Sequence, residues 1–386
     1  MRNFTFHNPT KIHFGEGQIA RLGDEIPAGS RVLVTHGGGS IFQNGVWAQV
    51  EAALADFAIS RFAGIEANPQ FDTLLRAVEQ ARRERCDFIL AIGGGSVIDG
   101  SKFIAAALYH PGDPLELLTG SVVSKAAPLG CVLTLAATGS ESNPHGIVTH
   151  VTRQQKLPFS SPLLYPRFAI LDPRTTFSLP PRQIGNGVVD AFVHTVEQYL
   201  TYPADAPLQD RYAEGLLQTL IEEGPKALAN PDDYAVRANL MWCATQALNG
   251  LIGCGVPQDW ATHMIGHELT ALYHLDHAQT LAVVLPALLA ERRQSKHAKL
   301  LQYAERVWQL RDGDEACRVN AAIVATRDFF KRMGVPTSLT EHGLDADVIP
   351  QVLAQLERHQ MTRLGEHGDI DLDASERILL RALQPA

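Results

Sequence analysis

The chain has 386 residues, 45% of them hydrophobic, and this length exceeds the usual size of one hydrophobic core, so two domains are expected. Its formal net charge is −9, no basic stripe occurs, and no stretch approaches the roughly 18 apolar residues of a membrane span, so neither nucleic acid nor a membrane is an expected partner. An odd number of cysteines without a C-x-x-C pair, and an N-terminus without an apolar core, indicate a reduced, cytoplasmic protein.

The first 180 residues alternate between short β-type runs and helical runs, which predicts a parallel sheet covered by helices. The expected strands are residues 31–35, 88–92, 130–135 and 168–171, and helical patterns such as 72–85 and 98–109 lie between them. After Pro180 and Pro181 the pattern changes, and the expected helices are residues 188–200, 209–220, 233–248, 259–272, 298–309 and 316–333. We therefore expect an α/β domain at residues 1–180 and an all-α domain at residues 181–386.

A glycine-rich turn lies where an expected strand meets an expected helix; it consists of Gly93, Gly94, Gly95 and Ser96. Glycines let a backbone pass close to a ligand, Ser96 is a candidate N-cap, and amides at a helix start attract phosphate. Ile98 breaks the Rossmann fingerprint and Ser101 breaks the Walker A motif. The turn is interpreted as a diphosphate cradle, with a simple tight turn as the structural alternative.

A second glycine turn, containing Gly37, Gly38 and Ser40, follows the strand at 31–35. Ligands of open α/β sheets lie at the carboxyl ends of strands, so both turns and the turn at 138–140 are expected to share one edge. No acidic residue occurs between Thr35 and Glu51, and an acid there would repel a 2′-phosphate. Its absence, with Ser40 as a donor, favours NADP(H) over NAD(H), although residues 37–50 contain no Arg or Lys to bind the phosphate.

Histidines and a carboxylate recur at helical spacing in the second half of the chain. Asp190 and His194 are four residues apart, as are His263 and His267, so each pair shares one helix face. His274 and His277 follow in what is expected to be a loop. Three imidazoles and one carboxylate suit Fe²⁺ or Zn²⁺, whereas any single histidine is more often an ordinary core or surface residue.

Taken together and in this order, these segments resemble the iron-containing (group III) alcohol dehydrogenases over essentially the whole chain, most closely their NADPH-dependent aldehyde reductase and butanol dehydrogenase branch. The matching segments are residues 93–96 with Asp99 and Lys102, 137–141, 171–173, 190–194 with Glu197, and 263–277. The resemblance implies a Rossmann-like dinucleotide-binding domain at residues 1–180, a helical metal-binding and catalytic domain at 181–386, and an active site in the cleft between them.

The resemblance also implies roles for individual residues. The metal ligands would be Asp190, His194, His263 and His277, while His267 would be a non-ligand histidine near the nicotinamide that relays a proton. The cofactor-binding residues would be Gly94, Gly95, Ser96, Asp99, Thr134, Thr138, Ser140 and Lys156, beside the turns already described. Two departures from the branch are Phe42 and Gln43, where lysines are common, and Asn143, where a threonine or valine is common.

The expected activity is hydride transfer between NADP(H) and a primary alcohol or short-chain aldehyde, with the metal as Lewis acid, in a homodimer. One alternative on the same scaffold is an NAD- and zinc-dependent polyol dehydrogenase or a dehydroquinate-synthase-like enzyme. A second alternative, from another class, is a non-catalytic metal- or nucleotide-binding protein.

Overall fold

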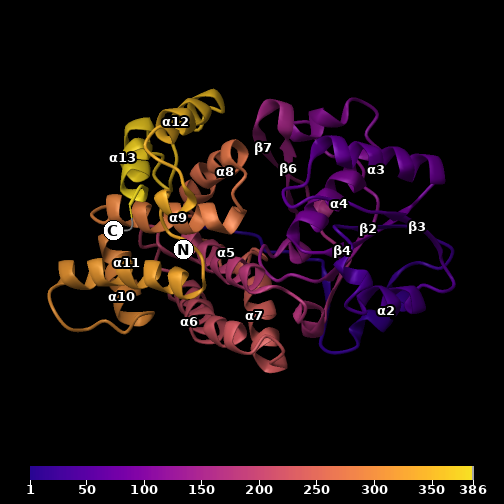
Figure 1. The fold of residues 1–386 in the computed structure, drawn as a ribbon, viewed down its shortest axis with the longest axis horizontal. Coiled ribbons are helices and arrows are strands. Elements are labelled where there is room, and N and C mark those ends of the chain that lie inside the picture. Colours follow the sequence, from indigo (N-terminus) through magenta and orange to yellow (C-terminus); the bar gives the residue numbers. More distant parts are fainter. Residues whose placement is uncertain (385–386) are drawn as a thin grey trace. The chain divides into compact units, whose positions relative to one another are not determined.

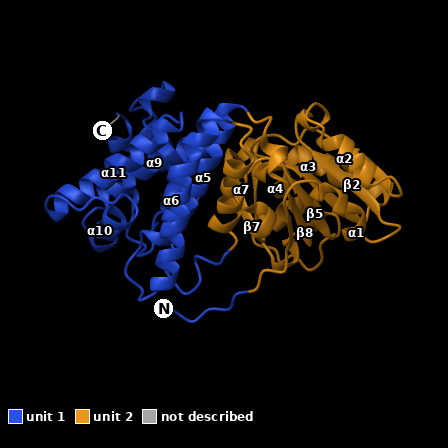
Figure 2. Cartoon of the chain, turned by 90° about the horizontal axis from the view of Figure 1, so that it is seen from below, with its two compact units in different colours: residues 1–6, 180–230, 250–386 blue, residues 7–179, 231–249 orange. Residues whose placement is uncertain are grey.

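The computed structural model describes residues 1–384, and the chain divides into two compact units (Figure 2). The helical unit consists of Met1–Phe6, Pro180–Asn230 and the chain from Gly250 onward; the sheet unit consists of His7–Leu179 and Pro231–Asn249. The division predicted from the sequence, between residues 180 and 181, differs from these units at residues 1–6, at Pro180 and at residues 231–249.

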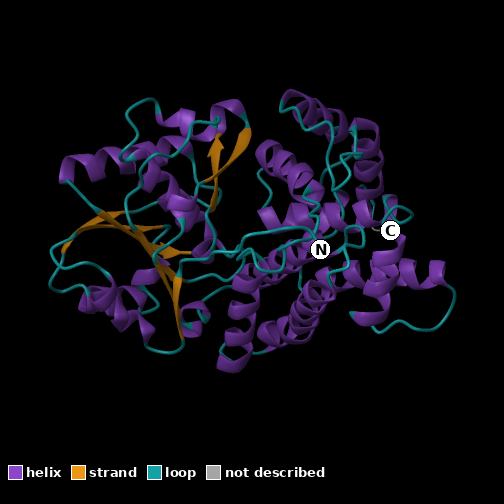
Figure 3. Cartoon of the chain, turned by 180° about the vertical axis from the view of Figure 1, so that it is seen from behind, coloured by secondary structure: helices purple, strands orange, loops and turns teal. Residues whose placement is uncertain are grey.

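The sheet unit contains a six-stranded sheet in the order β1-β8-β5-β4-β2-β3, with every neighbouring pair parallel. Figure 1 labels β2, β3 and β4 of this sheet, and Figure 3 shows the strands in orange. Its strands are β1 (Lys11–Phe14), β2 (Arg31–His36), β3 (Ala58–Phe62), β4 (Phe88–Gly93), β5 (Leu129–Leu133) and β8 (Phe168–Leu171). The four predicted strands are present, and the predicted α/β fold class is confirmed. Strands β1 and β3 were not predicted because they lie at the two edges of the sheet and are only partly buried.

Both faces of the sheet are buried, and alternate residues of each strand belong to different cores. Val32 and Val34 of β2 lie in the core covered by α1 (Leu22–Glu25) and α2 (Val46–Ala53). Leu33 lies in the opposite core, under α3 (Phe71–Glu84) and α4 (Gly95–Ala107). Burying each such side chain contributes about 1.5–3 kcal/mol, so the alternation fixes the register of the strands.

Two further elements complete the sheet unit. An antiparallel hairpin, β6 (His145–His150) and β7 (Gln155–Ser160), follows the 138–143 turn. Helix α7 (Tyr234–Ala247) belongs to this unit because Arg237 is buried and donates to Thr176, and Trp242 packs edge-on against Phe14. The domain boundary predicted from the sequence does not include α7 in the sheet unit, because both contacts join segments that lie at least 61 residues apart in the chain.

In the helical unit, the residues described form helices and one isolated β-bridge. The helices are α5 (Pro181–Tyr199), α6 (Pro207–Ala229), α8 (Ala261–Tyr273), α9 (His277–Glu291), α10 (His297–Arg306), α11 (Glu315–Arg332), α12 (Val348–Arg358) and α13 (Leu372–Ala382). The prediction of an all-α second half is confirmed for this unit. No helix among the described residues is long and apolar enough to cross a bilayer.

Candidate active site

Helix α5 supplies two of the expected metal ligands. It begins with Pro181, whose fixed φ suits a first helical position, and runs for 19 residues. Asp190 and His194 lie one turn apart on its buried side, with exposures of 2% and 4%. The nearest approach between them is 3.7 Å, from His194 Nδ1 to Asp190 Oδ1, so the helical spacing brings both groups to one place.

Helices α8 and α9 supply the other histidines. His263 and His267 lie in α8, one turn apart and buried. His277 was expected in a loop, but it is the first residue of α9. Asp276 and Gln279 form a capping box that starts this helix, and His274, in a left-handed conformation, ends α8. The short turn between the two helices thus holds His277 beside α8.

Three side chains from these three helices converge. One ligand atom each from Asp190, His263 and His277 lies within 4.8 Å of the others. His277 Nε2 is 3.6 Å from Asp190 Oδ1, and the His194 and His263 rings are stacked with centroids 4.7 Å apart. All four expected ligands are therefore neighbours. The fifth predicted residue, His267, has its ring centroid 5.2 Å from that of His277.

The protonation state of His194 suits a metal ligand. Burial lowers the pKa of this imidazole to about 4; Asp190 partly opposes that shift, while His263 adds to it. His194 Nδ1 is buried, and no described residue forms a hydrogen bond with it. A neutral imidazole binds a cation, and a buried nitrogen lacking a hydrogen bond is costly otherwise. Three nitrogens and one carboxylate at these separations therefore fit a divalent transition metal.

Glu197 orients one of the histidines. One of its carboxylate oxygens contacts His263 Nδ1, and the other accepts the His263 backbone N–H at 3.3 Å. This contact leaves Nε2 as the ring nitrogen that can bind a metal. Burial raises the pKa of Glu197 well above its usual range, and Asp259 adds to that shift. The sequence placed Glu197 in a matching segment but gave it no role.

A buried lysine fixes the start of α8, and it was not predicted. Lys296 forms an ion pair with Asp259 at 2.9 Å, and it donates to Glu366 at 2.6 Å and to the Leu200 carbonyl at 2.8 Å. Asp259 in turn accepts the N–H of Ala261, the first residue of α8, at 2.8 Å. Lys296 thus ties the start of α8 to the end of α5.

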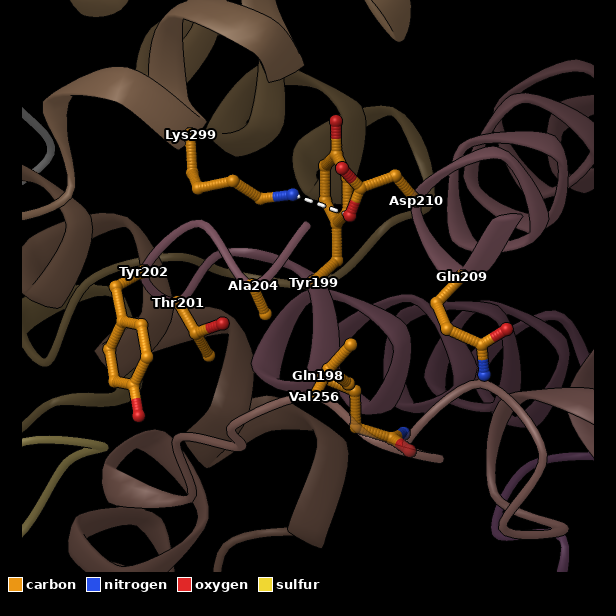
Figure 4. Close-up of a pocket in the computed structure, with 9 residues that line it drawn as sticks. All are labelled: Gln198, Tyr199, Thr201, Tyr202, Ala204, Gln209, Asp210, Val256 and Lys299. Atoms are coloured by element: carbon orange, nitrogen blue, oxygen red, sulfur yellow. Dashed lines mark hydrogen bonds and ion pairs between the residues drawn. The ribbon is translucent and has the colours of Figure 1, made fainter. Parts of the chain in front are cut away.

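A separate cavity in the helical unit holds none of the expected ligands. Lys299 points across Tyr199 toward Asp210 in its wall, at 2.6 Å (Figure 4). The Lys299 ammonium also lies 4.2 Å from the Tyr199 ring centroid. The Lys299 and Asp210 charges in this cavity are thus paired with each other, and the cavity is separate from the expected metal ligands.

In the sheet unit, the two glycine turns flank the point where the strand order reverses. The chain passes from β2 to β3 on one side and then to β4 on the other, so β2 and β4 are neighbours. The turn with Gly37, Gly38 and Ser40 follows β2, and the turn at residues 93–96 follows β4. Such a switch point is the usual ligand-binding place in open α/β sheets.

The second turn is packed too closely for larger residues. A Cβ on Gly94 would lie 3.0 Å from Leu135 Cβ, and a Cβ on Gly95 would overlap Thr138. Thr134, the residue after β5, donates its backbone N–H to the carbonyl of Gly93, the last residue of β4, at 3.0 Å. The predicted residues of the β4 and β5 turns therefore lie side by side, and glycine is needed where the two turns pack against each other.

Ser96 was expected as the N-cap of the following helix, but that position is Gly94 and Ser96 lies in the first turn of α4. Its hydroxyl accepts the Asn68 backbone N–H at 3.3 Å, and the Asn68 side chain accepts from Lys156 at 3.0 Å. Asn68 has a φ of 61°, the left-handed region that asparagine tolerates. This residue, which the sequence did not indicate, connects two predicted cofactor residues.

Asp99 and Ser140, two of the predicted cofactor-binding residues, form hydrogen bonds within the protein. Ser140 donates to Asp99 at 2.5 Å and accepts from the fully buried Lys102 at 2.7 Å. Burial raises the pKa of Asp99 and lowers that of Lys102 to about 8, while each charge partly opposes the shift of the other. Asn143, the second departure from the branch, accepts from Lys102 at 3.2 Å and donates to two carbonyls. Its amide is thus used in holding the turn.

Known proteins match both halves of the chain. Residues 9–173 match the family described as iron-containing alcohol dehydrogenase, and residues 185–379 match its C-terminal model. The chain is 58% identical to the NADPH-dependent aldehyde reductase YqhD of Escherichia coli, covering 98% of this chain and 99% of that protein. It is 37% identical to the NADH-dependent butanol dehydrogenase A of Clostridium acetobutylicum, covering 97% of both.

Solved structures agree with these matches. The crystal structure of Escherichia coli YqhD has a TM-score of 0.97 at 58% identity and covers 99% of both chains. The NADH-dependent butanol dehydrogenase A of Thermotoga maritima has a TM-score of 0.94 at 34% identity, covering 100% of this chain and 99% of that one. The chain therefore belongs to the iron-containing alcohol dehydrogenase family. It is an oxidoreductase that acts on the alcohol–aldehyde couple.

Proposed function

We propose that this enzyme reduces short-chain aldehydes to primary alcohols, and oxidises such alcohols, with NADP(H) and one divalent metal ion, Fe²⁺ or Zn²⁺. The helical unit holds the metal and the sheet unit binds the dinucleotide. The observation that carries the proposal is the convergence of Asp190, His263 and His277 within 4.8 Å, with His194 against Asp190. This set of donors at these separations is suited to a Lewis-acidic cation.

The chain's own residues hold and orient the reacting groups. When bound, the metal polarises the substrate oxygen and the nicotinamide exchanges a hydride with the substrate carbon. Glu197 fixes the ring of His263, and burial keeps His194 neutral so that it can act as a ligand. His267 lies one turn from His263 and beside His277, which suits the relay of a proton between the substrate oxygen and solvent.

The choice of coenzyme rests on the first glycine turn. Relatives in the family are named for both coenzymes, NADPH in the Escherichia coli protein and NADH in the butanol dehydrogenases. In this chain, no acidic residue lies between Thr35 and Glu51, and Ser40 and Gly38 are exposed at the end of β2. An acid in that turn would repel a 2′-phosphate, so its absence supports NADP(H).

The test is a coenzyme-oxidation assay on a panel of aldehydes and alcohols with NADPH and NADH, before and after chelation. We expect aldehyde reduction with NADPH, a lower kcat/KM with NADH, and loss of activity on chelation that Fe²⁺ or Zn²⁺ restores. Activity that survives complete metal removal would contradict the metal role. Turnover restricted to polyols, ring closure, or binding without turnover would favour the alternative enzymes or a non-catalytic protein. The expected homodimer stays a prediction that sedimentation would check.

A further inference from the structure

Four side chains form a cluster beside the first glycine turn: His36, Phe42, Trp47 and Arg61. His36 ends β2, and its ring meets that of Phe42 edge-on with centroids 5.1 Å apart. Phe42 contacts Trp47 at 5.4 Å, and the Arg61 guanidinium lies over the Trp47 ring, 5.3 Å from its centroid. An aromatic ring thus holds a cation beside the segment that carries Ser40.

The cluster lies on one face and at one end of the sheet. Arg61 is in β3 next to Val34 of β2, so it is close to the carboxyl end of both strands. The loop that follows β3 is bonded to the first turn, because the Gly64 N–H donates to the carbonyls of His36 at 3.1 Å and of Gly37 at 3.2 Å. These bonds tie the end of β3 to the glycine turn.

Arg61 is exposed, and no described carboxylate lies within 4 Å of its guanidinium. The Arg61 charge lies close enough to His36 to add to the lowering of that imidazole's pKa, which is caused first by burial. Residues 37–50 contain no Arg or Lys, so a cation at this edge must come from another segment of the chain. The neighbouring strand β3 provides one, held in place by contact with an indole.

We propose that Arg61 recognises the 2′-phosphate of NADP(H), with Trp47 holding its guanidinium beside the turn at Gly37–Ser40. This inference rests on the proposed use of NADP(H) and goes further by naming the residue that selects it. A guanidinium donates two parallel hydrogen bonds to a phosphate, and such charge-assisted bonds are stronger than neutral ones. Phe42 and Gln43, which follow the turn, carry no charge, and this leaves the task to Arg61.

The experiment compares NADPH and NADH binding to the full-length enzyme by fluorescence titration, with 2′-AMP and 5′-AMP as probes. Arg61→Gln is expected to weaken NADPH and 2′-AMP binding roughly 10- to 100-fold and to leave NADH and 5′-AMP unchanged. Arg61→Lys should restore part of the affinity, since it keeps the charge but loses the planar fork. Trp47→Leu should weaken NADPH binding less than Arg61→Gln does, because it removes the support and keeps the cation.

Arg83→Gln is the matched control, because Arg83 is an exposed arginine of the same unit, at the end of α3. It should leave both coenzymes unaffected, and melting curves will show whether each variant is folded. If the wild-type enzyme prefers NADPH and folded Arg61→Gln keeps that preference, the inference is overturned while the proposed function stands. If the wild-type enzyme binds both coenzymes equally, the proposed coenzyme and the role of Arg61 both fail.

Discussion

Glu197 holds His263 at two points, with one carboxylate oxygen against the ring Nδ1 and the other accepting the backbone N–H at 3.3 Å. Glu197 is in α5, three residues beyond His194, and His263 is in α8. The pair therefore joins the two helices that carry three of the proposed ligands, and it fixes both the rotation of the imidazole and the nitrogen it presents.

Replacing the carboxylate of Glu197 should lower the affinity of the site for its metal without unfolding the protein. Glu197→Gln keeps the side-chain volume but leaves one acceptor oxygen in place of the two that contact the ring and the backbone N–H of His263, so the imidazole is held less firmly. We expect a loss of roughly 10- to 100-fold in metal affinity, measured by competition with a chromophoric chelator, and a parallel loss of activity at limiting metal. Glu214→Gln is the control, since Glu214 is also buried but bonds Tyr199 and Gln302 instead. Equal metal affinity in the Glu197 variant and the wild type would contradict the orienting role.

His263 and His267 should separate metal binding from proton transfer. His263→Ala removes a proposed ligand, so the purified protein should contain no stoichiometric metal and show no turnover. His267→Ala should keep its metal and lose roughly 10²- to 10⁴-fold in kcat, as expected when a general acid–base group is removed. Metal analysis and kcat measured on the same preparations provide the check. Loss of metal from the His267 variant would make that residue a ligand.

Spacing along the chain was sufficient to predict part of the site. Asp190 and His194 are one helical turn apart, so a sequence pattern places both on one face before any fold is known. The four central strands were predictable for a similar reason, because a strand buried on both faces appears as a continuous apolar run. The hairpin of β6 and β7 was missed because Pro158 and several polar residues interrupt that signal.

Contacts between distant segments could not be predicted in this way. Lys296 lies 37 residues from Asp259 and 70 from Glu366, and only the packed helices bring their charges together. The position of Arg61 is unpredictable for the same reason, because only the pairing of β2 with β3 brings Arg61 next to Val34 and near the first glycine turn. His277 was placed in a loop because its helix begins with an Asp276–Gln279 capping box whose geometry depends on the turn before it.

The glycines of the two turns should respond differently to an added methyl group. A Cβ on Gly95 would overlap Thr138, so Gly95→Ala should lower the free energy of unfolding by roughly 1–3 kcal/mol. Gly38 has no heavy atom within 4 Å of such a Cβ and lacks a positive φ, so Gly38→Ala should melt like the wild type. If a dinucleotide passes this turn, the same variant should still bind NADPH more weakly.

Gly215→Ala is the control for these substitutions. Gly215 lies inside α6 with open space around the added Cβ, so the change should stabilise the protein by roughly 0.5–1 kcal/mol and leave coenzyme binding unaltered. Melting curves and NADPH titrations of the three variants decide the matter. Unchanged NADPH affinity in Gly38→Ala would place the dinucleotide away from the first turn.

The buried ammonium of Lys102 should make stability depend on pH in the alkaline range. Its pKa is lowered from the ordinary 10.5 to about 8, first by burial, so between these values the unfolded chain holds more protons than the folded one. Stability contributed by this group therefore rises with pH across that window, by roughly 3 kcal/mol at most. Lys102→Met removes this increase of stability with pH, because methionine does not titrate. It also removes the charge that limits the raised pKa of Asp99, so ionising Asp99 then costs the folded state more as pH increases.

Both effects have the same sign, so the melting-temperature deficit of Lys102→Met should grow between pH 7.5 and pH 10. Thermal unfolding of the two proteins across this range measures the deficit directly. Lys125→Met is the matched control, because Lys125 is an exposed lysine of the same unit, and its deficit should stay constant with pH. A deficit for Lys102→Met that shrinks with rising pH would mean that the ammonium is not disfavoured by burial, and that the contacts with Ser140 and Asn143 outweigh desolvation.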